Sequence, residues 1–175
     1  MIIVISGTAG SGKSTLAKAL AGELGLKYLC AGDMVRKMAQ EKKMDVLEFG
    51  EYLKNHPELD REVDNTTITE AKKGNCILEG RLSAWMLKEN KIPAFKILLN
   101  ASSHVAARRI VEREGVDFEE ALEKSKQREK ANWQRYKALY GIDHDDESWY
   151  DLVVYTDEMS IEEVFDYVLK AVGRT

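Results

Sequence analysis

The sequence has little cysteine and proline and no long apolar run. Two cysteines and two prolines occur in 175 residues, so neither a disulfide framework nor a proline-rich linker is expected. Cys30 and Cys76 lie in apolar, strand-like runs, where a small buried thiol is the ordinary interpretation. No segment reaches the roughly 18 consecutive apolar residues that span a bilayer, so no membrane association is expected.

Positive charge is also in slight deficit. The chain has 26 Lys and Arg against 30 Asp and Glu, a formal net charge of −4. This balance argues against binding to polymeric nucleic acid but permits small phosphorylated ligands held by a few local cations. The apolar start, Met1 to Ile5, leads into a glycine-rich loop without a basic leader, so it predicts a strand and a cytoplasmic protein. We expect one compact domain over residues 1–175, and a monomer.

Short apolar runs alternate with helical patterns along the chain. Leu16, Leu20 and Leu24 repeat at four-residue intervals, which is typical of an amphipathic helix. Strands that alternate with helices predict right-handed crossovers and a parallel sheet covered on both faces, a three-layer α/β fold. The five predicted strands are Ile2–Ile5, Lys27–Cys30, Cys76–Leu78, Phe95–Leu99 and Leu152–Tyr155.

Two helical segments are longer than a simple crossover requires. The first covers about residues 32–73 and is interrupted at His56-Pro57. The second covers about residues 102–140 and is polar and rich in charge. Insertions at the carboxyl ends of parallel strands lie where α/β folds bind ligands. We therefore interpret the first as a monophosphate-binding insertion and the second as a lid.

The strongest motif follows the first predicted strand. It has Walker A spacing and lies between a buried strand and an amphipathic helix, the context that this motif requires. Its backbone amides are predicted to surround the phosphates of a nucleotide at the positive end of the helix. Lys13 is expected at the β- and γ-phosphates of ATP, and the Ser14 hydroxyl is expected to bind Mg²⁺. The loop reads Gly7-Thr8-Ala9-Gly10-Ser11-Gly12-Lys13-Ser14-Thr15.

Two arginines and a glutamate follow the second and third predicted strands. Arg36 lies one turn into the helix that opens at 32, and Arg81 directly follows the third strand. Both are expected at the carboxyl edge of the sheet, where their guanidinium groups can grip the phosphate of an acceptor. For either arginine alone, a surface salt bridge remains an alternative. Glu79 ends the third strand and is expected to orient a water ligand of Mg²⁺, or else to pair with a neighbouring cation.

Arginine is concentrated in the second insertion, which holds five of the nine in the chain. Arg109 and Arg113 share one face of a predicted helix through their four-residue offset. Arg128, Asn132 and Arg135 share another. We predict that Arg109, Arg113 and Arg128 stabilise the charge that develops on a transferring phosphoryl group, while the lid excludes water. The alternative is a solvated helix whose arginines pair with neighbouring glutamates.

Together these motifs resemble the cytidylate kinases, especially the short archaeal type, over almost the whole chain. The resemblance implies a P-loop kinase fold with sheet order 2-3-1-4-5. It also implies transfer of the γ-phosphoryl group of ATP to CMP or dCMP, with Mg²⁺, to give CDP or dCDP. Besides the P-loop, it is carried by Ala31-Gly32-Asp33-Met34-Val35-Arg36, Leu78-Glu79-Gly80-Arg81, Arg128…Asn132…Arg135 and Tyr140-Gly141-Ile142-Asp143.

The resemblance further implies roles for individual residues. Arg36 and Arg81 would hold the phosphate of CMP. Arg128 and Arg135 would reach the acceptor or the transferring group. The residues expected to border the acceptor are Ala31, Gly32, Asp33, Gly80 and Asn132. Where many relatives carry Arg-x-x-Arg in the lid, this chain reads Ala106-Ala107-Arg108-Arg109, so only the second arginine is matched.

Other functions remain open to a P-loop protein of this size. The acceptor could be another monophosphate such as UMP or AMP, or dephospho-coenzyme A. Shikimate and gluconate fit less well, because an acceptor without phosphate does not need the pair Arg36 and Arg81. A nucleotide-dependent switch without enzymatic activity is the more distant alternative, and the sequence has no Asn-Lys-x-Asp motif for reading guanine.

Overall fold

The computed structural model describes residues 1–142 and 146–173. Its centre is a five-stranded parallel sheet in the order β2-β3-β1-β4-β5, which confirms the expected order. Every predicted apolar run forms a strand. Asp143, which belongs to one of the motifs noted above, lies outside the described residues. The strands are β1 (Ile2–Gly7), β2 (Lys27–Cys30), β3 (Cys76–Glu79), β4 (Phe95–Asn100) and β5 (Leu152–Tyr155).

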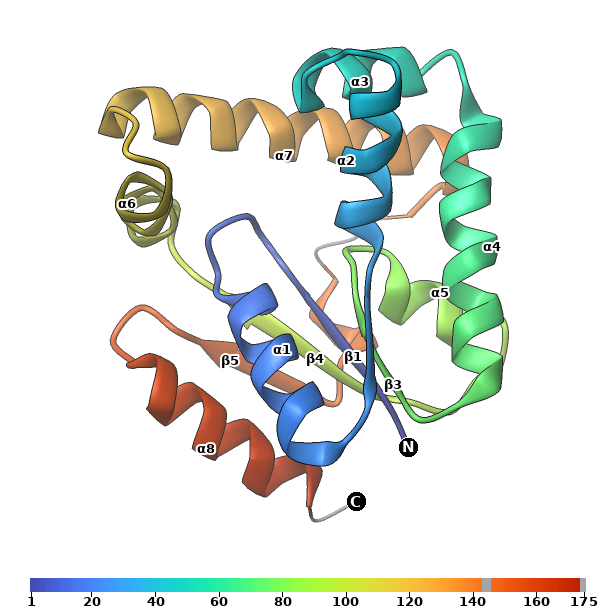
Figure 1. The fold of residues 1–175 in the computed structure, drawn as a ribbon, viewed down its shortest axis with the longest axis vertical. Coiled ribbons are helices and arrows are strands. Elements are labelled where there is room, and N and C mark those ends of the chain that lie inside the picture. Colours follow the sequence, from blue (N-terminus) through green and yellow to red (C-terminus); the bar gives the residue numbers. More distant parts are fainter. Residues whose placement is uncertain (143–145, 174–175) are drawn as a thin grey trace.

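Helices cover both faces of the sheet. The helices α1 (Lys13–Leu24) and α8 (Ile161–Val172) lie on one face, and α4 (Pro57–Lys73) and α5 (Ser83–Glu89) lie on the other (Figure 1). Ile3 and Ile5 point into the first hydrophobic core, while Val4 points into the second. Because successive residues of a strand face opposite sides, a strand buried on both faces must be apolar throughout. This confirms the predicted three-layer fold.

The first insertion consists of α2 (Ala31–Glu41), α3 (Val46–Leu53) and α4. The expected break at His56-Pro57 is present, with Pro57 in the first turn of α4. A second break separates α2 from α3, where Lys43 has a left-handed φ of 57°. Asp45 then caps α3 by accepting amide hydrogen bonds, and the Glu48 carboxylate accepts a hydrogen bond from the Asp45 amide.

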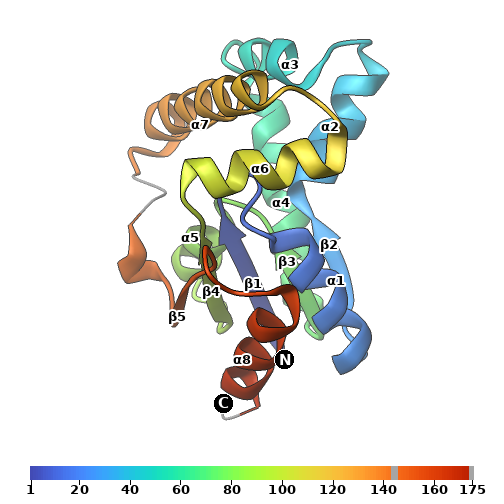
Figure 2. The same ribbon diagram turned by 90° about the vertical axis from the view of Figure 1, so that its left-hand side faces the viewer.

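The second insertion consists of α6 (Ser103–Glu114) and α7 (Phe118–Tyr140), followed by a short 3₁₀ helix, Glu147–Trp149. The two long helices pack against each other, and α7 also packs on α3. The long helix α7 runs across the top of the molecule, and α6 crosses over the carboxyl edge of the sheet (Figures 1 and 2). Within the described part of the chain, no helix is both long and apolar enough to cross a membrane.

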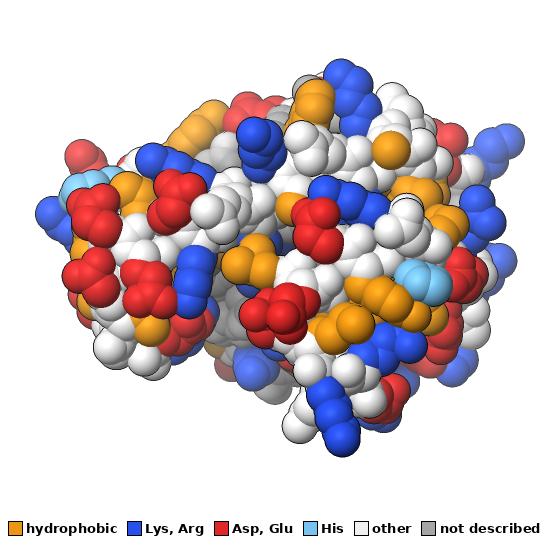
Figure 3. Space-filling view, turned by 90° about the horizontal axis from the view of Figure 1, so that it is seen from above, with side chains coloured by type: hydrophobic (Ala, Val, Ile, Leu, Met, Phe, Trp, Pro, Cys, Tyr) orange, Lys and Arg blue, Asp and Glu red, His pale blue; other side chains and the backbone are white. Residues whose placement is uncertain are grey.

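The outer face formed by α3 and α7 carries Lys and Arg interspersed with Asp and Glu (Figure 3). A surface of mixed sign has no strong net field over long distances.

Candidate functional site

The P-loop joins β1 to α1 and passes very close to neighbouring elements. Gly7, Gly10 and Gly12 all have positive φ, at 144°, 78° and 92°. A Cβ at Gly7 would collide with the carbonyl oxygen of Leu99, and one at Gly10 would lie 2.5 Å from that of Ala106. Only glycine therefore allows the loop to approach both β4 and α6. No side chain caps the start of α1, so its first amides can bind an anion.

Lys13 folds back over the loop. Its Nζ donates a hydrogen bond to the carbonyl oxygen of Thr8. Burial of the ammonium group, reinforced by repulsion from Arg81, lowers the pKa of Lys13 to about 7. The surroundings of Lys13 therefore disfavour its charged form, and a bound phosphate would favour that form instead.

A hydrogen-bonded group of three side chains lies beside the first turn of α1. Ser14 Oγ donates to Glu79 Oε1 at 2.8 Å, and the Tyr28 hydroxyl donates to the other carboxylate oxygen. Burial and this hydrogen bond raise the pKa of Tyr28, which keeps the phenol neutral and donating. Glu79 is thus fixed from β2 and α1 at the end of β3. The sequence pattern gave no reason to single out Tyr28.

The Ser14 hydroxyl and the Glu79 carboxylate fit a hard cation that keeps most of its water and phosphate ligands, as Mg²⁺ does. Among the described residues, no group of three or more His, Cys, Asp or Glu could enclose a metal by itself. The donor set therefore suits an ion that takes its other ligands from a nucleotide and water.

Four cations from different elements meet at the carboxyl edge of the sheet. Arg128 of α7 has its pKa lowered to about 10 by burial and then by repulsion from Arg81 and Arg36. Arg81 and Arg128 likewise lower the pKa of Lys13. These mutual effects place the four groups near one another, although they are up to 115 residues apart in sequence. Such a cluster of like charges is typical of a binding site for several phosphate groups.

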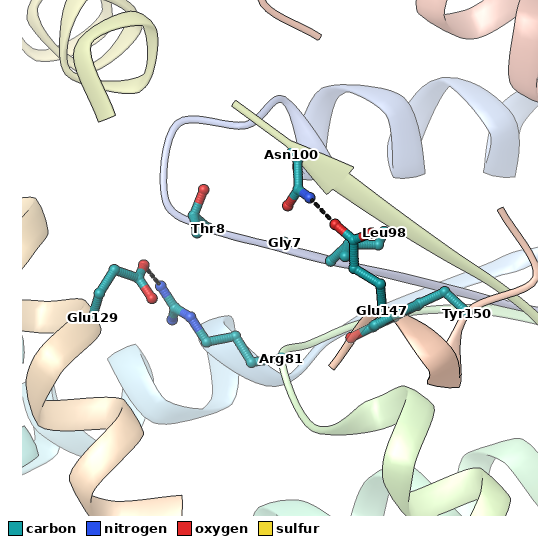
Figure 4. A pocket seen from close by; sticks show the side chains of 8 residues that line it. All are labelled: Gly7, Thr8, Arg81, Leu98, Asn100, Glu129, Glu147 and Tyr150. Atoms are coloured by element: carbon teal, nitrogen blue, oxygen red, sulfur yellow. Dashed lines mark hydrogen bonds and ion pairs between the residues drawn. The ribbon is translucent and has the colours of Figure 1, made fainter. Parts of the chain in front are cut away.

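Glu129 of α7 partly compensates this charge. It forms an ion pair with Arg81 (Figure 4). Its Oε1 also accepts a hydrogen bond from the Ala9 amide at 3.3 Å. Burial acts to raise the pKa of Glu129, but Arg81 outweighs it and the pKa is lowered, so the side chain is ionised. A carboxylate therefore lies against a P-loop amide and an arginine, both groups that could instead bind phosphate. From the sequence, Glu129 entered only the alternative of a solvated helix, as one of the glutamates that would pair with its arginines.

A pocket of about 270 Å³ opens beside this pair. It lies between the start of the P-loop, the ends of β3 and β4, and α7 (Figure 4). Its lining residues are Gly7, Thr8, Arg81, Leu98, Asn100, Glu129, Glu147 and Tyr150.

All but one of the residues expected to border an acceptor lie at the ends of β2 and β3; the exception, Asn132, lies on α7. Arg36 pairs with Asp33 one turn earlier in α2, and its side chain is 47% exposed. A Cβ at Gly80 would lie 3.1 Å from the Cβ of Ala31, so these two positions adjoin. Gly32 adjoins Arg36, because a Cβ at Gly32 would lie 3.3 Å from Nη1 of Arg36.

The lid arginines have different surroundings. Arg109 donates to the hydroxyl and the carbonyl oxygen of Thr156, at 2.9 and 2.7 Å, and to the Gly10 carbonyl oxygen at 3.4 Å. It thus links the base of the lid to the P-loop. Arg113 is 64% exposed and pairs with Glu114, so this structure does not bring it to the cation cluster. Arg108 is exposed.

Asn132 and Arg135 lie farther along α7 and are both buried, at 7% and 6% exposure. Arg135 pairs with Asp60 of α4, with 3.1 Å between Nε and Oδ2. The predicted stripe of Arg128, Asn132 and Arg135 therefore faces inward, but only its first member lies within the cation cluster.

Comparison with known proteins gives closely similar relatives. The family model described as the cytidylate kinase-like family matches residues 2–158. The cytidylate kinase of Pyrococcus horikoshii is 47% identical over 98% of this chain and 88% of its own length. That of Methanocaldococcus jannaschii is 45% identical over 98% of this chain and 97% of its own.

Solved structures share the fold at low sequence identity. A protein of uncharacterized function from Eubacterium ventriosum has a TM-score of 0.77 and 19% identity, covering 100% of this chain and 99% of its own. The shikimate kinase of Aquifex aeolicus has a TM-score of 0.60 and 17% identity, covering 99% and 96%. At these identities the likeness concerns the fold alone.

Proposed function

The chain belongs to the cytidylate kinase-like family, and from that premise we propose that it transfers the γ-phosphoryl group of ATP to CMP, and also to dCMP. The observation that carries this proposal is the convergence of Arg81 and Arg128 near Lys13, with Arg36 near Arg128. A P-loop and its lysine suffice for the phosphates of one nucleotide. Three further arginines provide for the phosphate of a second.

The P-loop amides and Lys13 would hold the donor phosphates, and Arg36 and Arg81 would hold the phosphate of the acceptor. Arg128 is close to both of these arginines, since Arg36 and Arg81 each lower its pKa. It would stabilise the charge on the group in transit. Arg109 and Arg113, which were predicted for the same role, are engaged here by Thr156 and by Glu114, and they would have to give up these partners to reach the transferring group.

Mg²⁺, when bound with ATP, neutralises charge on the β- and γ-phosphates. Ser14 Oγ would be its protein ligand, and Glu79 would orient one of its waters. A monophosphate oxygen is already anionic at neutral pH, so these residues need only align it with the γ-phosphoryl group. No side chain is therefore required as a general base.

The test is ADP formation from ATP and Mg²⁺ with CMP, dCMP, UMP, AMP and GMP offered separately. We expect turnover with CMP and dCMP, none without an acceptor, and loss of turnover in Lys13→Ala. Lys18→Ala, an exposed lysine on the same helix, is the matched control and should remain active. Binding of ATP without phosphorylation of any monophosphate would overturn the proposal. The expected monomer and cytoplasmic location remain predictions from the sequence.

A further inference from the structure

A tyrosine on the edge strand β2 reaches the carboxyl end of β3. In the register of the two strands Tyr28 lies opposite Ile77, so Glu79, two residues farther along β3, points to the same face of the sheet. That face is the one covered by α1, and the Tyr28 ring packs against the hydrophobic core between them. A diagonal neighbour on the same face is within reach of an aromatic side chain. The Tyr28 hydroxyl uses this reach to donate a hydrogen bond to Glu79 Oε2.

The Glu79 carboxylate is therefore held at both of its oxygens. Ser14 Oγ, from α1, donates to Oε1 at 2.8 Å, and Tyr28, from β2, donates to Oε2. Glu79 is only 6% exposed, so solvent cannot easily replace a donor that is lost. Two donors from separate elements fix the plane of the carboxylate, whereas Ser14 alone would leave it free to turn about that single hydrogen bond.

The orientation of Glu79 decides what Ser14 offers to a cation. A serine hydroxyl has one proton and two lone pairs. Because the proton of Ser14 is donated to Glu79, its lone pairs remain available for the Mg²⁺ that these donors fit. A carboxylate that turned away would leave the serine proton without its acceptor, and a hydroxyl whose proton is not fixed is a poorer metal ligand.

Packing alone does not require the hydroxyl of Tyr28. A phenylalanine or a leucine would fill the same half-buried place on an edge strand, without a polar atom that needs a partner. The hydroxyl matters only to Glu79 and, through it, to Ser14.

We propose that Tyr28 is a positioning residue for Mg²⁺, acting through Glu79 and Ser14 without touching the metal or the nucleotide. The inference rests on the part of the proposed function that assigns Mg²⁺ to Ser14 and Glu79. Residues that orient metal ligands typically change metal affinity by about 10- to 100-fold when they are substituted. Since Tyr28 acts one step farther from the metal than Glu79, we expect an effect at the lower end of this range.

The test measures the binding of ATP by calorimetry, once with excess Mg²⁺ and once with EDTA, and without acceptor. The ratio of the two dissociation constants is the factor by which Mg²⁺ strengthens binding. Tyr28→Phe removes only the hydroxyl, so this factor should fall by about tenfold, while the dissociation constant in EDTA stays within about twofold of that of the wild type. A purely structural role would lower the melting temperature and leave the factor unchanged.

Tyr155→Phe is the matched control. Tyr155 lies on β5, the strand at the other edge of the sheet, and its hydroxyl also donates to a glutamate, Glu147, at 2.9 Å. The substitution therefore removes the same kind of hydrogen bond from the same kind of strand. Both dissociation constants should stay as they are in the wild type.

A double-mutant cycle shows whether Tyr28 acts through Glu79. In Glu79→Gln the charge that Tyr28 orients is already gone, so adding Tyr28→Phe should lower the Mg²⁺ factor by less than about twofold. An equal loss in both backgrounds would overturn the inference. Tyr28→Leu is a second variant in case Tyr28→Phe does not fold, because it keeps an apolar side chain on the core and should lose the factor to the same extent.

The outcomes separate this inference from the proposed function. If Mg²⁺ strengthens ATP binding equally in the wild type and in the Tyr28 variants, the inference fails and the proposed function stands. A wild type that binds ATP equally well with and without Mg²⁺ would also overturn the inference, even if CMP is phosphorylated. Failure to phosphorylate any monophosphate would overturn the proposed transfer to CMP but not the role of Tyr28, because the binding measurement needs no acceptor.

Discussion

Binding of ATP should protonate Lys13. In the protein without nucleotide, burial and the neighbouring Arg81 lower the pKa of Lys13 to about 7, so a large part of the lysine is neutral at neutral pH. Phosphate oxygens beside Nζ favour the charged form and restore a high pKa. The proton that the lysine lacks must then be taken from solvent when ATP binds.

The size of the effect follows from the pKa. With a value of about 7, binding should take up about 0.1 proton at pH 6, about 0.5 at pH 7 and about 0.9 at pH 8. The sign is that of a base whose pKa rises in the complex, so affinity falls as the pH increases. Between pH 6 and pH 8 the dissociation constant for ATP should increase by about tenfold from this residue alone.

Isothermal titration of ATP and Mg²⁺ without acceptor, repeated in buffers of different ionisation enthalpy, measures the proton uptake. ATP has ionisations of its own, so the control must keep the ligand and change the lysine. Lys13→Arg serves this purpose, because a guanidinium group stays charged in proteins at any of these pH values. The difference between the two proteins isolates Lys13. The reasoning is wrong if both proteins take up the same number of protons, or if the uptake by the wild type does not grow with pH.

Three further predictions concern the carboxylates around the site. Glu79→Gln keeps a partner for Ser14 but loses the charge that orients a metal-bound water, so kcat should fall by about 10- to 100-fold and a higher Mg²⁺ concentration should be required for activity. An unchanged dependence of activity on Mg²⁺ would contradict this role of Glu79. Glu129→Gln should bind CMP up to about tenfold more tightly, measured by calorimetry, because Arg81 is released from its ion pair; weaker binding would mean that Glu129 instead positions Arg81. Burial raises the pKa of Asp64 to about 6, so its contribution to stability is present below pH 4 and is lost as the pH rises through about 6. The melting temperature of Asp64→Asn should therefore rise relative to that of the wild type between pH 4 and pH 7.5. A difference in melting temperature that stays constant over this range would contradict the raised pKa of Asp64.

Much of the fold could be predicted because its determinants are local. The run Ile2-Ile3-Val4-Ile5 has to be buried on both faces, and a glycine loop followed by leucines at four-residue spacing identifies the strand, turn and helix around the P-loop. The order of the strands is not local, and it came from the family resemblance. The break between α2 and α3 escaped prediction because it depends on the left-handed Lys43, a residue type that carries no turn signal.

The site residues that follow strands could be predicted from the sequence. Those that depend on how two helices face each other could not. Arg36 and Arg81 follow strands, so the sheet itself brings them to one edge, and Lys13 follows from its motif. By contrast, the contact of Arg135 with Asp60 depends on how α7 is rotated against α4. The seven-residue spacing of Arg128 and Arg135 does not predict that rotation. The sequence also does not show that Asp60 Oδ2 and Arg135 Nε lack hydrogen bonds.

The same distinction applies to Glu129, whose position depends on how α7 faces the P-loop. Glu129 lies where phosphate should bind and is already satisfied by Arg81 and the Ala9 amide, so it competes with the ligand and its neutralisation should strengthen binding.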